Sequence, residues 1–174
     1  MTNNRKLITQ EEVQLKMFDL KPTTTVVRSR CPIKFERPPN KILDGLYLGS
    51  FEVASSLHEL EKVNITHTLN MHHEKVEYPD IITKNLPIWD DPEWDLLSVL
   101  EECFDFIDKA IKSDGNVLVH CYAGISRSAA VIIGYLMKTK KMSYDDAYLF
   151  VKKKRPVAFP NEGFVKQLKS LEKN

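Results

Sequence analysis

One stretch of the sequence, "NVLVHCYAGISRSAAVIIGYL" at 116–136, joins two apolar runs through a short loop. The first run, residues 116–120, is short enough for a strand that is buried on both faces, as strands of parallel sheets are. The second run predicts a helix from about 127 to 140, long enough to cover such a strand. A buried strand, a short loop and a buried helix in succession predict one unit of an α/β fold.

Strands and helices alternate through the rest of residues 41–174. Short β-branched runs between turn residues predict strands, and helical spacing of apolar residues or a capping side chain predicts helices. The predicted strands are two in "KILDGLYLGS" (41–50, around the turn at Asp44-Gly45), 65–71, 81–88 and 116–120; the predicted helices are 52–62, 95–112, 127–140 and two that Ser143 and Asn161 cap. This order predicts an α/β fold whose central, mostly parallel sheet of about five strands is flanked by helices.

Helix 95–112 has a clear apolar stripe. The residues of the stripe are Leu96, Val99, Leu100, Cys103, Phe106, Ile107 and Ala110. Spacing of this kind predicts that the helix packs on the sheet through this face. Cys103 is therefore expected to be a core thiol and not a redox partner of another cysteine.

The first forty residues differ in composition from the rest. Residues 21–40 contain four prolines, which forbid a long helix and predict an extended segment. A capping box and an apolar stripe predict a short helix over about 10–20, from Thr9, Glu12, Val13, Met17 and Leu20. We expect residues 1–40 to form an N-terminal helix with a proline-containing extension, and residues 41–174 to form one domain.

Composition limits the classes of partner. A formal net charge of +1 gives no reason to expect a nucleic-acid-binding protein. The longest apolar stretch, residues 129–137, is too short to span a bilayer, and the first residues lack the pattern of a signal peptide. Three cysteines without framework spacing favour a reducing compartment. We expect no nucleic-acid or membrane partner and a cytoplasmic location, with the nucleus as a second location; the oligomeric state stays open.

The loop after strand 116–120 carries a thiol and a guanidinium. In α/β sheets, ligands bind beyond the carboxyl ends of the strands, where a helix N-terminus faces them. Gly124 can take the positive φ that lets the loop amides converge into an anion-binding cup. Arg127 can hold two oxygens of a tetrahedral anion, and these positive surroundings favour the thiolate form of Cys121. A thiolate that faces a bound oxyanion is suited to attack phosphorus.

Two residues adjacent to Arg127 and Cys121 also have expected roles. Ser128 can hydrogen-bond the thiolate or help it to leave in a second step, and His120 is expected to be a buried residue that orients the loop. The alternative is structural, because a cysteine at a strand end is usually inert and an arginine at a helix start is usually a solvated charge. Their combination at this spacing favours catalysis.

The segment "HCYAGISRS" (120–128) resembles the signature of the cysteine-dependent protein tyrosine phosphatases, and its interior resembles the small atypical dual-specificity phosphatases. The similarity includes "LYLGS", "ITHTLN", "SYDDAYLFVKKKRP" and "PNEGF" and does not cover the first forty residues. It implies that residues 41–174 are a catalytic domain, with Cys121 as nucleophile, Arg127 as phosphate binder and Ser128 as helper of phosphoenzyme breakdown. The expected substrate-binding residues are Tyr122, Ala123, Gly124, Ile125, Ser126 and Arg127, with His120 and Asn161 in support.

A phosphate ester also needs a general acid for its leaving group. The loop "IWDDPEWD" offers four acidic residues, and the resemblance implies an aspartate about thirty residues before the cysteine. Asp90, which lies 31 positions before Cys121, is our choice, and Asp91 is the alternative. The acidic residues can also have a purely structural role. Asp91 before Pro92 is typical of a helix cap, and Asp95 can cap the helix that follows.

The expected function is hydrolysis of phosphotyrosine and phosphoserine or phosphothreonine in proteins, through a cysteinyl phosphate and without metal or cofactor. A protein kinase is one expected substrate, for which "RSRCPIKF" (28–35) offers a weak docking motif. The alternatives are a silent phosphoprotein-binding module, a sulfur transferase, or a phosphatase of phosphoinositides or RNA 5′-phosphates. The uncharged loop interior speaks against a lipid headgroup.

Three further features are ambiguous. His72 and His73 are adjacent, and a solvated loop explains them more simply than a metal site. The run "KKKRP" (152–156) complements a helix C-terminus, or serves as an acidic-substrate or nuclear signal. Tyr122 and Phe159 are aromatic residues that can flank the pocket, and for Phe159 core packing or simple exposure is an equal alternative.

Overall fold

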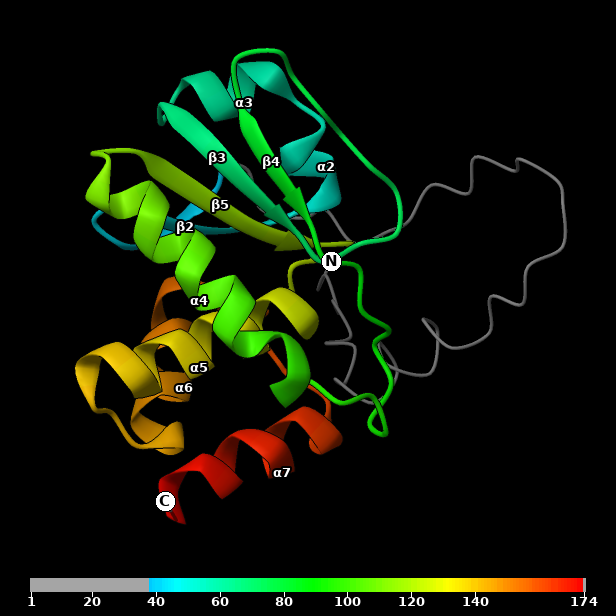
Figure 1. Cartoon of the computed structure of the whole chain (residues 1–174), viewed down its shortest axis with the longest axis vertical. Helices are drawn as coiled ribbons and strands as arrows, with labels where there is room; N and C mark the ends of the chain where they lie inside the picture. The colour runs from blue at the N-terminus through cyan, green and yellow to red at the C-terminus, as the bar shows by residue number, and fades with distance from the viewer. Residues whose placement is uncertain (1–37, 174) are drawn as a thin grey trace, which may run out of the picture. The chain divides into compact units, whose positions relative to one another are not determined.

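The computed structural model describes residues 38–173, in which a five-stranded sheet carries helices on both faces (Figure 1). The chain divides into two units, residues 1–34 and 35–174, and the described residues belong to the second. The predicted helix over 10–20 and the motif at 28–35 lie outside the described residues.

The sheet is mixed and mostly parallel, as predicted. Its strands are β1 (Asn40–Leu43), β2 (Leu46–Ser50), β3 (Ile65–Asn70), β4 (Ile82–Asn85) and β5 (Asn116–Cys121). They lie in the order β1-β2-β5-β3-β4, and only the β1–β2 pair is antiparallel. β5, the last strand in the chain, therefore lies between β2 and β3. This central position brings residues at its carboxyl end next to the ends of two other parallel strands.

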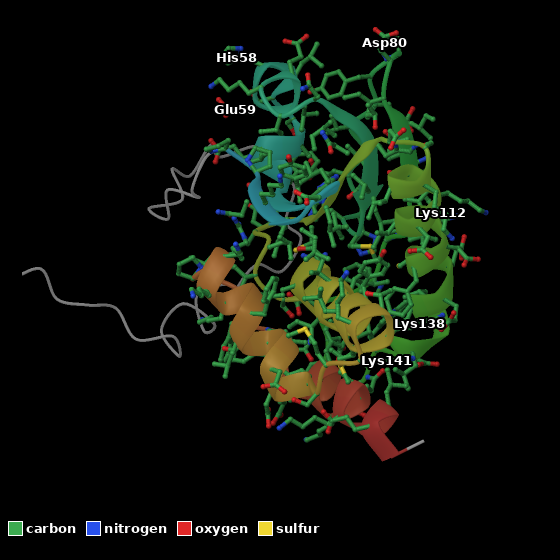
Figure 2. All side chains as sticks on the ribbon, turned by 90° about the vertical axis from the view of Figure 1, so that its left-hand side faces the viewer. His58, Glu59, Asp80, Lys112, Lys138 and Lys141 are labelled. Atoms are coloured by element: carbon green, nitrogen blue, oxygen red, sulfur yellow. The ribbon has the colours of Figure 1, made fainter. Side chains whose placement is uncertain are left out.

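Helices cover the two faces unequally (Figure 1). Two short helices, α2 (Phe51–Ala54) and α3 (Leu57–Glu61), lie on one face. The other face carries α4 (Leu97–Lys112) and α5 (Arg127–Lys140), followed by α6 (Tyr144–Lys154), α7 (Glu162–Ser170) and the 3-10 helix η1 (Leu171–Lys173). Lys112, at the end of α4, projects away from the ribbon, whereas side chains fill the space between helices and sheet (Figure 2).

Alternation along β5 builds a core on each face of the sheet. Val117, Val119 and Cys121 belong to the larger core below α4 and α5, and Leu118 belongs to the smaller core below α2 and α3. All four side chains are at most 1% exposed. A central parallel strand of this kind is apolar on both sides, which is why its sequence is an unbroken apolar run.

Local signals set the ends of the later helices. Ser143 accepts a hydrogen bond from the Asp146 amide at 3.1 Å at the start of α6. Asn161 accepts one from the Phe164 amide at 2.9 Å at the start of α7. Both predicted caps are confirmed, and α5 has the bounds expected from its apolar run.

Two predicted elements need correction, and the apolar stripe of a third gains a residue. The helix expected over 52–62 is two short helices, because Ser55 and Ser56 break it and Ser56 begins α3. The strand expected over 81–88 is regular only at residues 82–85, although the Leu86 and Ile88 amides, on either side of Pro87, still donate to the Asn70 and Met71 carbonyl oxygens. In α4, Phe104 joins the stripe, buried at 5% exposure, and the predicted Phe106 is half-buried, packs against the same core and contacts the His67 ring.

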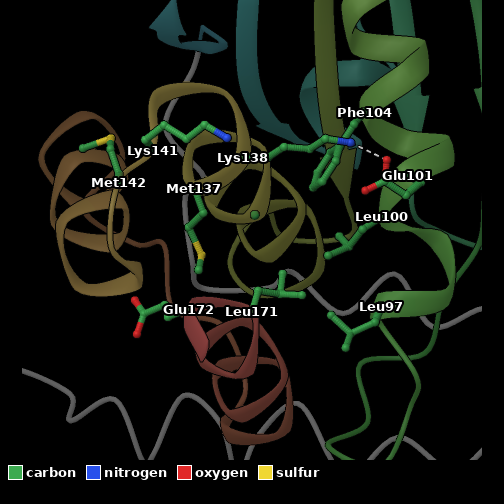
Figure 3. A pocket seen from close by; sticks show the side chains of 11 residues that line it. Leu97, Leu100, Glu101, Phe104, Met137, Lys138, Lys141, Met142, Leu171 and Glu172 are labelled. Atoms are coloured by element: carbon green, nitrogen blue, oxygen red, sulfur yellow. Dashed lines mark hydrogen bonds and ion pairs between the residues drawn. The ribbon is translucent and has the colours of Figure 1, made fainter. Parts of the chain in front are cut away.

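A cavity of about 500 Å³ opens between α4, the C-terminal half of α5 and η1 (Figure 3). Leu100, Phe104 and Met137 line it, and Lys138 forms an ion pair with Glu101 at its side. The cavity is at the opposite end of α5 from Arg127. In residues 38–173 no helix has the length and apolar character needed to cross a membrane.

Candidate active site

Cys121 is the last residue of β5, where it pairs with Ser50 of β2. Its side chain is 1% exposed, and two donors face its sulfur. The Gly124 amide donates to Sγ at 3.3 Å, and the Ser128 hydroxyl donates to Sγ at 3.2 Å. Both donors stabilise negative charge on sulfur, and the start of α5 adds the positive end of a helix dipole.

The loop between Cys121 and Arg127 curls at Gly124, which has a φ of +67°. A Cβ atom at Gly124 would lie 2.4 Å from the carbonyl oxygen of Gly49. Both the backbone conformation and the contact exclude a side chain there. The expected glycine-dependent curl is present, and β2 fixes it from outside.

Arg155 secures this curl and was missed from the sequence. Its side chain is 0% exposed. Its Nε donates to the carbonyl oxygen of Gly124 at 2.6 Å, its Nη2 to that of Ala123 at 3.0 Å, and its Nη1 to Oδ1 of Asn40 at 2.5 Å. The guanidinium therefore holds two loop carbonyls away from the cup, so that the loop amides face inward. The run "KKKRP" contains one buried positioning arginine after three lysines at the end of α6.

Arg127, the first residue of α5, is 8% exposed. Its Nη1 donates to the carbonyl oxygens of Ile88 at 3.3 Å and Met71 at 3.5 Å. Its Nε makes no hydrogen bond within the described residues, and the nearest carboxylate oxygen, Oδ2 of Asp90, is 3.7 Å away. The guanidinium is thus held by backbone while one buried N–H is left for a ligand.

Asp90 is brought to the same place from the loop before α4. Its Oδ1 accepts hydrogen bonds from the Ser126 hydroxyl at 2.6 Å and from Nδ2 of Asn161 at 2.9 Å. Ser126 in turn accepts from the Asn161 amide at 3.0 Å. Asn161 therefore both caps α7 and orients Asp90, while Oδ2 of Asp90 stays on the side of Arg127.

Two of the other three acids, Asp91 and Asp95, make turn contacts. Asp91 is exposed and accepts from the Glu93 amide at 2.9 Å, but no helix begins at Pro92. Asp95 accepts from the Ser98 amide at 3.2 Å beside the start of α4. Asp95 lies one residue before the N-cap Leu96 and bonds the first turn of α4, whereas the helix cap expected at Asp91 is a local turn.

His120 is buried at 1% exposure behind the loop. Burial lowers its pKa to about 4, because a charged imidazole loses its hydration there. Its Nδ1 has no hydrogen-bond partner within residues 38–173. The burial predicted for His120 is confirmed, and its role in orienting the loop stays a prediction.

The remaining predicted residues in and around the loop differ in how exposed they are. Ala123 is buried and Ile125 is half-buried, with the Ile125 carbonyl oxygen accepting from the Phe159 amide at 2.7 Å. Tyr122 and Phe159 are 44% and 39% exposed. Cys103 lies in the core of α4, where burial raises the pKa of its thiol to about 12.

The structure gathers the predicted residues at the carboxyl edge of the sheet, and it adds contacts that the sequence did not indicate. The predicted residues are His120, the loop 121–127, Ser128, Asp90 and Asn161. The loop between β5 and α5 thus carries a thiol with two donors and a partly free guanidinium, and the Asp90 carboxyl group contacts Ser126 of the same loop. This arrangement suits nucleophilic attack on a tetrahedral oxyanion with proton delivery to the leaving group.

Comparison with known proteins agrees with this chemistry. Residues 46–174 match the family model "Dual specificity phosphatase, catalytic domain". The chain is 43% identical over 138 residues to dual specificity protein phosphatase 1 of Arabidopsis thaliana, covering 78% of this chain and 70% of that protein. It is 42% identical over 129 residues to dual specificity protein phosphatase 19 of Mus musculus, covering 73% and 59%. The crystal structure of DUSP15 superposes with a TM-score of 0.75 at 36% identity, covering 76% of this chain and 86% of that chain.

Proposed function

The chain belongs to the dual-specificity phosphatase family and is a protein phosphatase; from this premise we propose that it acts through a cysteinyl phosphate on Cys121, without a metal ion. The observation that carries the proposal is the pair of donors on Sγ, from Gly124 at 3.3 Å and Ser128 at 3.2 Å. Substrates are phosphotyrosine and phosphoserine or phosphothreonine side chains of proteins, a protein kinase among them.

In the first step, the Cys121 thiolate attacks phosphorus and the bond from phosphorus to the ester oxygen breaks. The amide cup and the free Nε of Arg127 hold the non-bridging oxygens, where negative charge is spread in the transition state. Asp90 donates a proton to the departing oxygen, which leaves as an alcohol or phenol. Since Oδ1 of Asp90 already accepts two hydrogen bonds, Oδ2 is the oxygen that carries this proton.

In the second step, water attacks phosphorus and the phosphorus–sulfur bond breaks. Asp90, now a carboxylate, takes a proton from the water, and inorganic phosphate is released. The Ser128 hydroxyl, 3.2 Å from Sγ, stabilises the thiolate as it leaves. Asp90 gives up a proton in the first step and regains one from water in the second, and Arg127 supplies the positive charge that the scheme uses.

The thiolate mechanism also limits the cellular compartment in which the enzyme can act. Cys121 must stay reduced to act as a nucleophile, so we propose a reducing setting, the cytoplasm with access to the nucleus.

The first test is hydrolysis of an aryl phosphate ester by the full chain, with and without a metal chelator, by wild type and Cys121→Ser. We expect turnover that the chelator does not reduce and that the serine variant lacks. Loss of turnover in chelator would refute metal independence, and turnover by Cys121→Ser would refute the cysteinyl phosphate. An inactive wild type that still binds vanadate would indicate a phosphoprotein-binding module instead.

A further inference from the structure

Five ring-bearing side chains gather beside the candidate site, and we call them the aromatic wall. The His72 ring stacks on the Tyr122 ring, with centroids 5.4 Å apart and an angle of 29° between the planes. The Phe51 ring also contacts His72, with a centroid distance of 5.2 Å. His73 lies 4.0 Å from Trp89, and 6.3 Å separates the two histidine rings. The wall is one connected set of rings.

Three residues of the wall are sequence neighbours of catalytic residues or of their contacts. Tyr122 follows Cys121 directly, and Trp89 directly precedes Asp90. His72 follows Met71, whose carbonyl oxygen accepts from Arg127. Each of these three rings is therefore one residue from a catalytic residue or a contact of one.

Backbone contacts fix part of the wall in place. The Phe51 amide donates to the Tyr122 carbonyl oxygen at 2.9 Å, and the Asn70 side chain accepts from the His72 amide at 2.7 Å. The rings at the base of the wall are thus attached to the ends of β2, β3 and β5, which also position the nucleophile. A ring anchored in this way can act as a rigid contact surface.

Packing explains only part of the wall. Phe51 and His72 are half-buried, but Tyr122 is 44% exposed and Trp89 is 59% exposed. Burial lowers the pKa of His72, and the nearby charge of Arg127 lowers this pKa further. The wall therefore presents two exposed aromatic rings, with His72 stacked on one of them, beside the catalytic residues.

We propose that the aromatic wall makes this enzyme prefer phosphotyrosine, with the Tyr122 and Trp89 rings contacting the substrate's phenyl ring while its phosphate occupies the loop. The preference rests on the function proposed above. In phosphotyrosine the ring carries the ester oxygen directly, so a phosphate in the loop leaves the ring at the entrance. Phosphoserine and phosphothreonine have no ring there. Aromatic pairs gain free energy beyond that of area burial, so the contact discriminates between the substrates.

The test measures kcat/KM for two peptides that differ only in phosphotyrosine or phosphothreonine at one position. Wild type, Trp89→Ala, Tyr122→Ala and Tyr122→Phe are compared. We expect the phosphotyrosine-to-phosphothreonine ratio to fall about three- to tenfold in each alanine variant, from the usual strength of one aromatic pair. The fall should appear mainly in KM, and Tyr122→Phe, which keeps the ring, should retain the wild-type ratio.

Leu149→Ala is the matched control, since it removes an apolar side chain that is 63% exposed on α6. The phosphotyrosine-to-phosphothreonine ratio of this variant should equal that of wild type. Because Trp89 adjoins Asp90, a disturbed acid would slow phosphothreonine hydrolysis more than phosphotyrosine hydrolysis, since the threonine alkoxide is the poorer leaving group. That effect raises the ratio and cannot produce the expected fall. An unchanged ratio in both alanine variants overturns the wall's role while both peptides are still hydrolysed. Failure of wild type to hydrolyse either peptide overturns the proposed function instead.

Discussion

Arg155 and Gly124 are joined by a hydrogen bond of 2.6 Å from Nε to the carbonyl oxygen, across 31 residues of sequence. The bond is buried, and a second one to Ala123 runs beside it. Together they fix the direction in which the loop carbonyls point, and hence the direction of the amides that face the site.

Arg155→Lys should therefore impair both activity and stability. An ammonium cannot reproduce the planar fork that reaches both carbonyls, so at least one of them loses its partner. We expect kcat/KM to fall at least tenfold and the free energy of unfolding to fall by about 2 kcal/mol, the usual cost of a lost charged hydrogen bond. Denaturant unfolding and steady-state kinetics measure the two effects. Lys153→Ala, a change at an exposed neighbour in α6, is the control and should alter neither.

Asp90→Ala should remove the general acid. Esters with poor leaving groups should lose about 10²- to 10⁴-fold in kcat, the usual range for acid catalysis, and esters with activated leaving groups should lose much less. Asp91→Ala should change kcat less than twofold, because Asp91 is exposed and holds only a turn. A series of aryl phosphates of graded leaving-group pKa gives the comparison. The reverse pattern in the two variants would make Asp91 the acid.

Ser128→Ala should slow the second chemical step more than the first. Without the hydroxyl at 3.2 Å, the thiolate is a poorer leaving group, and we expect kcat to fall about ten- to a hundredfold, the usual range for a hydrogen bond to a charged group. A burst of product followed by slow turnover in rapid-quench experiments would reveal the accumulated phosphoenzyme. A slower burst with no accumulation would contradict this assignment.

His120 should make stability depend on pH. The buried imidazole has a pKa of about 4, whereas the unfolded chain protonates near 6.5. Below 6.5 the unfolded state therefore binds more protons, and stability falls as pH decreases toward 4. Between pH 7.5 and 5 we expect a loss of about 2 kcal/mol from this group. Urea unfolding of wild type and His120→Asn at both values measures it, and an equal loss in the variant would refute the assignment.

The sequence predicted those parts of the fold whose signals are local. The apolar run of β5, the length of α5 and the caps Ser143 and Asn161 each depend on neighbouring residues, and the structure confirms them. The break between α2 and α3 was missed, because serines within a polar helix carry no clear stop signal. The clustering of Cys121, Arg127 and Asp90 agrees with the prediction, since loops at one edge of a parallel sheet meet there.

Arg155 and Ser126 make contacts that cannot be predicted from neighbouring residues in the sequence. Arg155 follows three lysines and looks like one more surface cation; its partners are carbonyl oxygens more than thirty residues earlier. Ser126 was expected to bind substrate through the loop, but its hydroxyl donates to Asp90. Such contacts depend on how distant segments pack, and no pattern within a helix or strand encodes them.

The hydrogen bond from Arg155 to Asn40 spans 115 residues, and it has a consequence for biosynthesis. β1 leaves the ribosome early, but the arginine that joins it to the catalytic loop is made near the end of the domain. Contacts of such high sequence separation form late, because closing a long loop costs chain entropy before it is stabilised. Catalytic competence should therefore be acquired after translation of α6, and a nascent chain that stops before Arg155 should be inert toward phosphoproteins.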